Sequence, residues 1–323
     1  MEIRISVVIP TYKRPELLVK CLNALSKQTL NHREFEIIVV SDGPDRYTET
    51  SLKNWNYKKK LNIRYFHTPA RKGPATARNL GWRQSSGSLI AFTDDDCLPA
   101  PGWLKAFADA YDDRLVSAFT GKTKVPLQAI QSDFANNTAQ LATAEFITAN
   151  CACSKTALAY LNGFDERFEM AWREDSDLQF RLLHNHIPII SIKKAVIIHP
   201  VRSVSWGISL KEQKNGIYDA LLYKKHPEYY RSRIQYYPIW NYYITILLWL
   251  VVTISLFTQA VLLSWITSTL LLSSIAFFFY KRFKNTDRSA RQLTEMLITS
   301  LAIPFLSVFW RFYGAIKFRV FFI

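Results

Sequence analysis

The first hundred residues alternate between short hydrophobic runs and longer stretches whose polar positions recur at helical spacing. The hydrophobic runs predict strands at Ile5–Ile9, Glu36–Val40, Ile63–Phe66 and Ser88–Phe92. A helix is expected between the first two strands, from Pro15, which suits a first helical position, to about Gln28. Buried strands that alternate with helices are typical of a doubly wound α/β sheet.

Residues 111–200 have a less regular pattern. Hydrophobic runs predict further strands at Ala118–Thr120, Phe146–Ala149 and Ala195–Ile198, and a helix is expected from about Asp175 to His186. No internal repeat or low-complexity tract separates this region from the first hundred residues. We therefore assign residues 1–205 to one α/β domain with a mixed sheet.

The composition changes near residue 238. Asn241–Tyr280 has no charged residue and is interrupted only near Thr258–Gln259. Because one membrane span takes about 20 residues, we expect a transmembrane helical hairpin over residues 239–280, after basic and aromatic linker helices at 206–238. A buried hairpin of a water-soluble protein is the alternative. Residues 281–323 are expected to form a basic loop and an apolar segment, broken by Pro304, that lies in the interface or in the membrane.

The charge balance indicates which partners to expect. The chain has 41 Lys and Arg against 26 Asp and Glu, a formal net charge of +15. Such an excess favours phosphates and an anionic lipid leaflet, and nucleic acid is not expected because no recognition motif accompanies the charge. Basic residues flank the predicted hairpin on both sides, which predicts a cell-membrane protein whose N-terminal domain is cytoplasmic. The cysteines include no C-x-x-C pair, which agrees with a reducing compartment.

Polar residues collect after the predicted strands. Pro10–Arg14 follows the first strand, Ser41–Pro44 the second and Asp94–Asp96 the fourth, so parallel strands would bring them to one cleft. Adjacent carboxylates repel one another, and a bound cation explains the Asp triplet most economically. Oxygen ligands suit Mg²⁺ or Mn²⁺ bridging a diphosphate. An acidic turn in solvent is the alternative.

Several segments together resemble, in order, the motifs of family 2 glycosyltransferases. They are Val7–Arg14, Val40–Gly43, Ala77–Asn79, Asp94–Asp96, Gly163–Glu166 and Trp172–Leu178. Each motif is weakly specific alone, but together they cover roughly residues 3 to 205 in the expected order. The resemblance implies a GT-A fold that transfers a sugar from a nucleotide diphosphate sugar, most commonly a UDP-sugar, with inversion at the anomeric carbon.

The resemblance also implies which residues bind the nucleotide. The matching positions are Pro10, Thr11, Tyr12, Arg14, Asp42, Arg78, Asp94 and Asp95. Alternatives remain open for some of them: a solvated charge for Arg14, a helix cap for Asp42 or Asp95, and for Arg78 a structural ion pair with Asp42 or the Asp triplet.

The same resemblance implies a metal site and a catalytic base. Asp96 matches the direct metal ligand, Asp94 a contact to ribose or to metal-bound water, and His199 an additional metal or diphosphate ligand, with a structural histidine as the alternative. Asp175 matches the base that deprotonates the acceptor hydroxyl, and Glu174 a residue that orients groups or binds the acceptor. Acidic residues in the first turn of a helix are the alternative for this pair.

Taken together, the sequence predicts a metal-dependent inverting glycosyltransferase that uses Mn²⁺ or Mg²⁺ and acts on a hydroxyl of a lipid-linked or cell-envelope glycan. One alternative is a nucleotidyltransferase that acts on sugar phosphates. A second is a non-catalytic, membrane-bound adaptor that only binds a nucleotide. The sequence leaves the oligomeric state open, a homo-oligomer included.

Overall fold

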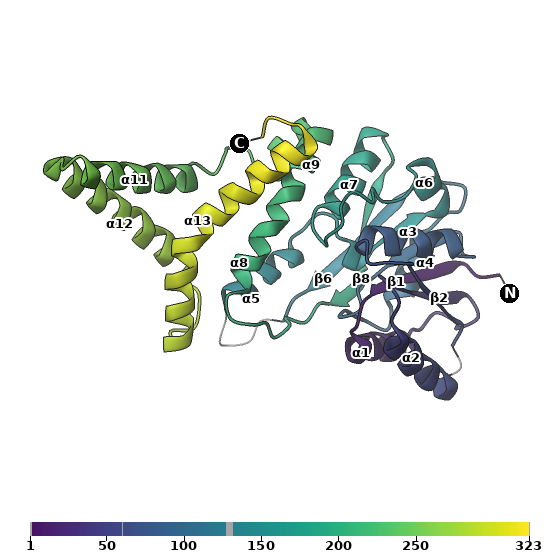
Figure 1. Cartoon of the computed structure of the whole chain (residues 1–323). Coiled ribbons are helices and arrows are strands. Elements are labelled where there is room, and N and C mark those ends of the chain that lie inside the picture. The colour runs from purple at the N-terminus through teal and green to yellow at the C-terminus, as the bar shows by residue number, and fades with distance from the viewer. Residues whose placement is uncertain (1, 60, 127–131, 323) are drawn as a thin grey trace. The chain divides into compact units, whose positions relative to one another are not determined.

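The computed structural model describes residues 2–59, 61–126 and 132–322 (Figure 1). The chain packs as two compact units. The N-terminal unit comprises Met1–Pro126 and Ala139–Val201, and the C-terminal unit comprises Leu127–Thr138 and Arg202–Ile323. The sequence pattern did not predict that a segment near residue 133 would pack with the C-terminal unit.

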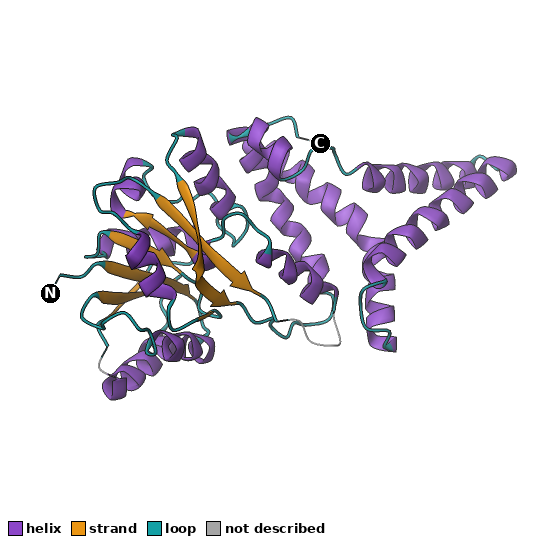
Figure 2. Ribbon diagram, turned by 180° about the vertical axis from the view of Figure 1, so that it is seen from behind, coloured by secondary structure: helices purple, strands orange, loops and turns teal. Residues whose placement is uncertain are grey.

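One eight-stranded sheet forms the centre of the N-terminal unit, with strand order β3-β2-β1-β4-β7-β6-β8-β5 (Figure 2). The strands are β1 Ile5–Thr11, β2 Phe35–Ser41, β3 Ile63–His67, β4 Leu89–Phe92, β5 Leu98–Pro99, β6 Ala118–Lys124, β7 Cys151–Ser154 and β8 Ile189–Ile198. The first four are parallel, with Val7 of β1 opposite Ile37 of β2 and Ala91 of β4. β7 is antiparallel to both β4 and β6, and β6 is parallel to β8. The sheet is therefore mixed, as predicted.

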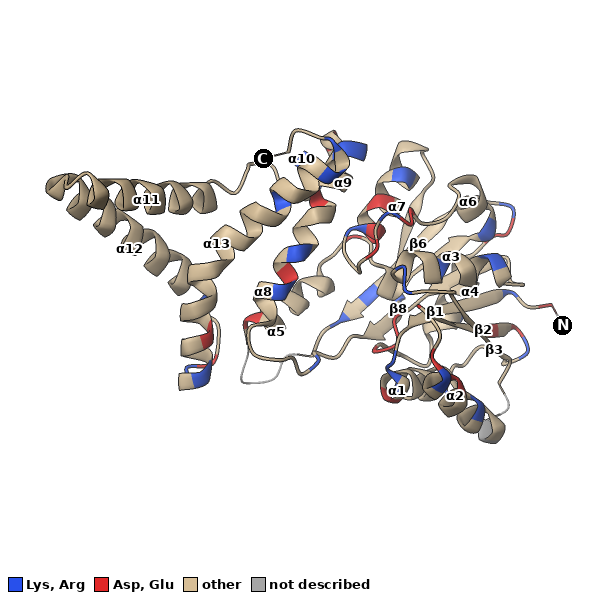
Figure 3. Cartoon of the chain, in the orientation of Figure 1, with Lys and Arg blue, Asp and Glu red and all other residues tan. Residues whose placement is uncertain are grey.

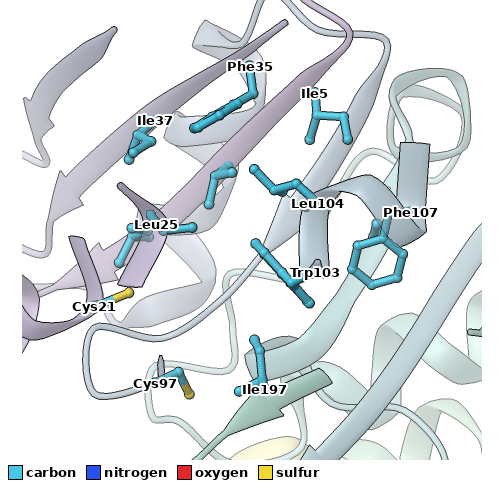
Figure 4. Packing of buried hydrophobic residues seen from close by; sticks show 14 of the residues in the cluster. Ile5, Cys21, Leu25, Phe35, Ile37, Cys97, Trp103, Leu104, Phe107 and Ile197 are labelled. Carbon is cyan, nitrogen blue, oxygen red and sulfur yellow. The ribbon is translucent and has the colours of Figure 1, made fainter. Parts of the chain in front are cut away.

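Helices cover both faces of this sheet. They are α1 Pro15–Leu25, α2 Arg46–Lys59, α3 Pro74–Gln84, α4 Trp103–Ala110, α6 Lys155–Tyr160 and α7 Glu174–His184. Because side chains alternate along a strand, β1 contributes to two cores. Ile5, Val7 and Ile9 pack with residues of α1 and α4 (Figure 4). Val8 packs on the other face with residues of α3, α6 and α7. This arrangement confirms the doubly wound architecture.

Two predicted elements differ from the observed ones. Helix α1 ends at Leu25, because the Gln28 side chain instead donates to the Ala100 carbonyl (2.8 Å) and accepts from the Leu104 amide (2.9 Å). The strand predicted at 146–149 is wrong: Thr148–Asn150 is a short 3₁₀ helix, and β7 begins at Cys151. The Asn150 side chain accepts from Trp103 Nε1 (2.8 Å), which ties this turn to α4.

The C-terminal unit is helical. Its helices are α5 Asp133–Ala139, whose last residue belongs to the N-terminal unit, α8 Ile208–Glu212, α9 Gly216–Lys225, α10 Pro227–Arg233, α11 Trp240–Phe257, α12 Val261–Phe283 and α13 Ala290–Phe318. α11 and α12 form a hairpin in which Thr245 and Ser274 share a hydroxyl hydrogen bond of 2.8 Å. α11, α12 and α13 are each long and apolar enough to cross a membrane. The break expected at Pro304 does not occur, because this proline is buried inside a continuous α13.

Candidate active site

The carboxyl ends of six strands meet at one edge of the sheet, because β1, β2, β3, β4, β6 and β8 all run in the same direction. β1 ends at Thr11, β2 is followed by Asp42, and β4 leads into the Asp triplet. β8 is followed by His199, whose amide donates to the Lys124 carbonyl at the end of β6 (2.8 Å). Polar groups from distant parts of the sequence are therefore gathered at the edge where α/β sheets bind ligands.

Asp42 accepts hydrogen bonds from backbone amides of the loop before α3. The Lys72 amide donates to Oδ1 (2.7 Å), and the Gly73 amide lies 3.0 and 2.9 Å from Oδ1 and Oδ2. Gly73 has φ of +98°, and a Cβ there would lie 2.3 Å from the Glu169 carbonyl, so this close approach requires glycine. Asp42 thus fixes the loop before α3 at this edge of the sheet.

The helix-cap alternative for Asp42 applies instead to Asp45. The Asp45 side chain accepts from the Thr48 amide (3.1 Å) and the Thr48 hydroxyl (2.6 Å) at the start of α2. It also accepts from the Lys13 amide (2.8 Å), which holds the loop after β1. Within that loop, two cations lie near the Tyr12 ring, with Arg71 Cζ 5.0 Å and Lys13 Nζ 5.2 Å from its centroid. The predicted opening loop and Asp42 are therefore neighbours.

Asp95 is directed toward the opening loop. Its Oδ2 accepts from the Thr11 hydroxyl (2.7 Å), and its Oδ1 lies 3.5 Å from Arg14 Nη1. Burial raises the pKa of Asp95 to about 6, although the Thr11 hydrogen bond and the Arg14 charge oppose the shift. Arg14 is half-exposed and paired, so it is neither fully buried nor a free surface charge. Asp95 therefore links the Asp triplet to the loop after β1.

Arg78 connects two carboxylates from distant segments. Its Nη2 donates to Asp94 Oδ1 (2.7 Å) and its Nη1 to Glu174 Oε1 (3.0 Å). The Arg78 side chain is only 2% exposed, and its Nε has no hydrogen-bond partner among the residues described. Of the two structural partners considered for Arg78, the triplet is therefore the one observed. The arginine fork holds Glu174 close to the triplet.

Glu174 and Asp175 form the first turn of α7, which Arg173 precedes in a left-handed conformation with φ of +75°. Glu174 is buried, and burial together with the neighbouring Asp175 charge raises its pKa to about 7 against the opposing charge of Arg78. Asp175 is partly exposed, and its pKa is also raised by desolvation, opposed by the Ser176 amide that donates to it (2.6 Å). Glu174 and Asp175 are thus acidic residues in the first turn of a helix, as the alternative had it, and this position is compatible with a chemical role.

A possible cation site lies beside Asp94. The ligand atoms of Asp94, Asp96, Cys97 and His199 all lie within 4.8 Å of one another. His199 Nε2 is 3.7 Å from Asp96 Oδ1, and His199 Nδ1, which is buried, has no hydrogen-bond partner in the described part of the chain. Carboxylate and imidazole donors suit Mn²⁺, whereas Mg²⁺ prefers oxygen alone. These residues fit a divalent cation, and Cys97 is a member that the sequence did not predict.

A second cluster explains two of the sequence motifs in structural terms. Asn79 Oδ1 accepts from the Phe164 amide (2.8 Å) and from Trp82 Nε1 (2.9 Å), and Asn79 Nδ2 donates to Glu166 Oε1 (2.8 Å). Gly163 has φ of +67°, and a Cβ there would lie 2.3 Å from Asn79 Oδ1. The motif at 163–166 is therefore clamped onto α3, the helix that positions Arg78. In the sequence, the order of the motifs was the only indication that residues 163–166 belong to the site.

Comparisons with known proteins agree with this geometry. Residues 6–148 match the family described as Glycosyl transferase family 2. Glycosyltransferase AglE of Haloferax volcanii is 36% identical over 101 residues, which cover 31% of this chain and 33% of AglE. The chain thus spans at most about a third of the length of the first relatives it matches.

Two solved structures are similar across most of the chain. Mannosyltransferase PcManGT from Pyrobaculum calidifontis, in complex with GDP-Man and Mn²⁺, aligns with a TM-score of 0.59 at 19% identity, covering 95% of this chain and 88% of PcManGT. TarS 1–349 of Staphylococcus aureus, in complex with UDP-GlcNAc, aligns with a TM-score of 0.51 at 18% identity, covering 93% and 91%. The mixed sheet and its helices thus resemble the GT-A fold, as predicted.

Proposed function

We propose, from the premise that residues 6–148 belong to glycosyl transferase family 2, that this protein is a metal-dependent inverting glycosyltransferase. It would move a sugar from a nucleotide diphosphate sugar, with UDP-sugar as the donor we propose, to a hydroxyl of a lipid-linked or cell-envelope glycan. PcManGT and TarS were solved with GDP-Man and UDP-GlcNAc, which supports a nucleotide-sugar donor for this fold but leaves the base open.

One observation carries the proposal. Arg78 joins Asp94, a member of the possible cation site, to Glu174, which precedes the proposed base. In an inverting enzyme, the diphosphate leaves from one side of the anomeric carbon and the acceptor hydroxyl is deprotonated on the other. The groups that stabilise the diphosphate and the general base must therefore lie on opposite sides of one bound sugar. A buried guanidinium that contacts both segments fixes their spacing.

The nucleotide would lie against the loop after β1 and the loop that Asp42 orders. Tyr12 presents an aromatic face beside Arg71, which suits base stacking and phosphate attraction. Asp96, Asp94 and His199 would hold a divalent cation, which would supply positive charge to stabilise the leaving diphosphate. Arg78 pairs with Asp94 and so holds the Asp94 carboxylate beside this site.

Asp175 is the proposed base. Its carboxylate is partly desolvated, which raises its pKa and makes it a better proton acceptor than a carboxylate in water. The Ser176 amide and hydroxyl both donate to Asp175 Oδ1, at 2.6 and 3.3 Å, which orients the carboxylate and leaves Oδ2 to accept the hydroxyl proton. Glu174, engaged with Arg78, holds the start of α7 in place.

The apolar C-terminal helices would keep the enzyme beside a membrane-bound acceptor, with the catalytic unit on the cytoplasmic side. This location suits an acceptor that carries a lipid. Purified protein reconstituted in vesicles would be tested with a panel of nucleotide sugars, with nucleoside diphosphate release as the signal.

The test compares Asp175→Asn and Asp96→Asn with Asp109→Asn, a matched change of an exposed carboxylate on α4. We expect Asp175→Asn to slow transfer by about 10²- to 10⁴-fold with little change in nucleotide affinity, since a general base contributes about that much. Asp96→Asn should weaken Mn²⁺-dependent nucleotide binding. Near wild-type transfer by both variants would refute the proposal.

Two measurements distinguish the two alternative functions. Release of pyrophosphate would indicate a nucleotidyltransferase. Calorimetric binding of uridine diphosphate with Mn²⁺, without turnover of any donor in the panel, would indicate an adaptor.

A further inference from the structure

The exposed face of helix α13 is apolar, unlike that of a helix on the surface of a water-soluble protein. Its exposed face carries hydrophobic residues at intervals of three or four: Leu297, Leu301, Phe305, Phe309, Phe312 and Ile316. Its buried face includes Thr299, Ser300, Ser307 and Arg311. An apolar face of this length, with polar groups turned inward, is suited to contact with lipid rather than water.

The buried face of α13 is covered along most of its length by residues 207–225. The Gly207 amide donates to Glu295 Oε1 (2.7 Å) near one end, and Lys224 Nζ donates to the Phe318 carbonyl (2.7 Å) at the other. Figure 1 shows α8 and α9 beside α13, and the Gly314 position lies so close to α9 that a Cβ there would be 2.6 Å from the Ile217 carbonyl. The two segments therefore pack closely along most of α13.

This covering segment is strongly charged, as the coloured bands on α8 and α9 show in Figure 3. Its charged residues are Lys211, Glu212, Lys214, Asp219, Lys224 and Lys225. If α13 crossed a bilayer, its packed neighbour would carry these groups into the hydrocarbon, where charged side chains are costly. α11 has no charged residue, and α12 has none before Lys281, close to its end.

Both ends of α13 are basic. Arg288 and Arg291 lie at its start, and Lys317 and Arg319 lie at its end. Under the positive-inside rule, positive charge at both ends places the two ends on the same side of the membrane. The same charges favour an anionic lipid surface.

We propose that α13 does not cross the membrane but lies in the lipid–water interface of an anionic bilayer, on the side from which α11 enters. α13 contacts the end of the hairpin that lies nearest to the membrane surface: Arg282, close to the end of α12, donates to Thr299 (2.8 Å) and Ser300 (3.0 Å). The chain therefore crosses twice, and its two termini lie on one side. This inference is independent of the proposed function.

The first experiment measures sidedness. The full chain, with a different epitope tag at each end, is placed in sealed vesicles rich in anionic lipid and treated with a membrane-impermeant protease. We expect both tags to be digested in the same vesicle population. Digestion of only one tag in uniformly oriented vesicles means that α13 crosses, which overturns the proposal.

The second experiment measures depth. Single cysteines replace Leu301, Phe309 or Ile316 on α13, with Leu250→Cys on α11 as the control inside a span. The native cysteines are all buried, so an added exposed cysteine is labelled selectively. With a fluorescent label and lipids that quench at defined depths, we expect all three α13 positions to be shallower than position 250.

A label at position 309 as deep as the label at 250 would contradict the proposal. So would labels on α13 that no lipid quencher reaches but that crosslink to a second copy, because the apolar face would then be a dimer interface. Sugar transfer measured in the same vesicles reports on the proposed function separately.

Discussion

Arg78 offers the sharpest test of the candidate site, because a single buried guanidinium balances Asp94 and Glu174. The change Arg78→Met retains an unbranched apolar stem but removes the charge and both hydrogen bonds. Removing one partner of a buried ion pair costs about 3–5 kcal/mol, since the remaining charge is left uncompensated. For a unit of this size about 1 kcal/mol corresponds to roughly 2–4 °C, so we expect the Tm at pH 8 to fall by about 6–20 °C.

The loss should depend on pH in a defined direction. Burial and Asp175 already raise the pKa of Glu174 to about 7, and removal of Arg78 raises it further. A carboxyl whose pKa is raised by folding contributes stability below its unfolded pKa and loses it as the pH rises through the folded value. In the variant, Glu174 therefore takes up a proton at a pH above about 7, so at pH 6 it is neutral and avoids part of the penalty. The Tm difference from wild type should therefore be smaller at pH 6 than at pH 8.

Thermal unfolding of the detergent-solubilised full chain, followed by fluorescence at both pH values, measures these effects. Arg78→Lys is the matched control, because an ammonium group keeps the charge but cannot bridge two carboxylates as the fork does, and its loss should be intermediate. The double change of Arg78→Met with Glu174→Gln should recover part of the Tm at pH 8. A Tm loss that is equal at both pH values, or a double variant less stable than Arg78→Met, would refute this electrostatic reasoning.

Three further predictions follow from described contacts. Gly163→Ala should destabilise the protein by about 1–3 kcal/mol, because φ is positive there and the new Cβ would meet Asn79; an unchanged Tm would contradict the clamp. Asp42→Asn should lower the affinity for uridine diphosphate, measured by calorimetry, about tenfold or more, because it weakens the charge-assisted hydrogen bonds from the Gly73 amide that order the loop. Unaltered affinity would argue against nucleotide binding at this loop. The transfer rate should rise with pH, because a base acts in its ionised form and burial raises the pKa of Asp175 above its ordinary value and that of Glu174 to about 7. A flat profile from about pH 5.5 to 8.5 would contradict a catalytic role for this pair.

The sequence was sufficient to predict the parallel half of the sheet, because β1, β2 and β4 are continuous hydrophobic runs buried on both faces. It also predicted that the segments after these strands meet at one edge, since parallel strands leave no other arrangement. The antiparallel insertion of β7 was not predictable in this way. β7 has only four residues, and its small side chains, such as Ala152, carry a weak periodic signal.

The partners of the site residues could not be predicted from the sequence either. Arg78 and Glu174 are 96 positions apart, and no local pattern indicates that they meet. The sequence also could not show which aspartate caps α2. Asp42 and Asp45 are three residues apart and offer the same carboxylate, and the structure shows that Asp45 is the cap. Cys97 was assigned no role in the site, since a cysteine beside an Asp triplet looks the same in sequence whether or not it faces a cation.

The strand order determines which fragments of the protein can be expressed as folded units. The segment that matches the family ends at residue 148, yet β4 and β6 both pair with β7, and β6 also pairs with β8, which lie beyond it. A fragment ending there would leave the backbone amides and carbonyls of β4 unpaired along one edge and those of β6 unpaired along both edges. Such open edges invite pairing between molecules, so this fragment should aggregate even though every residue recognised by similarity is present.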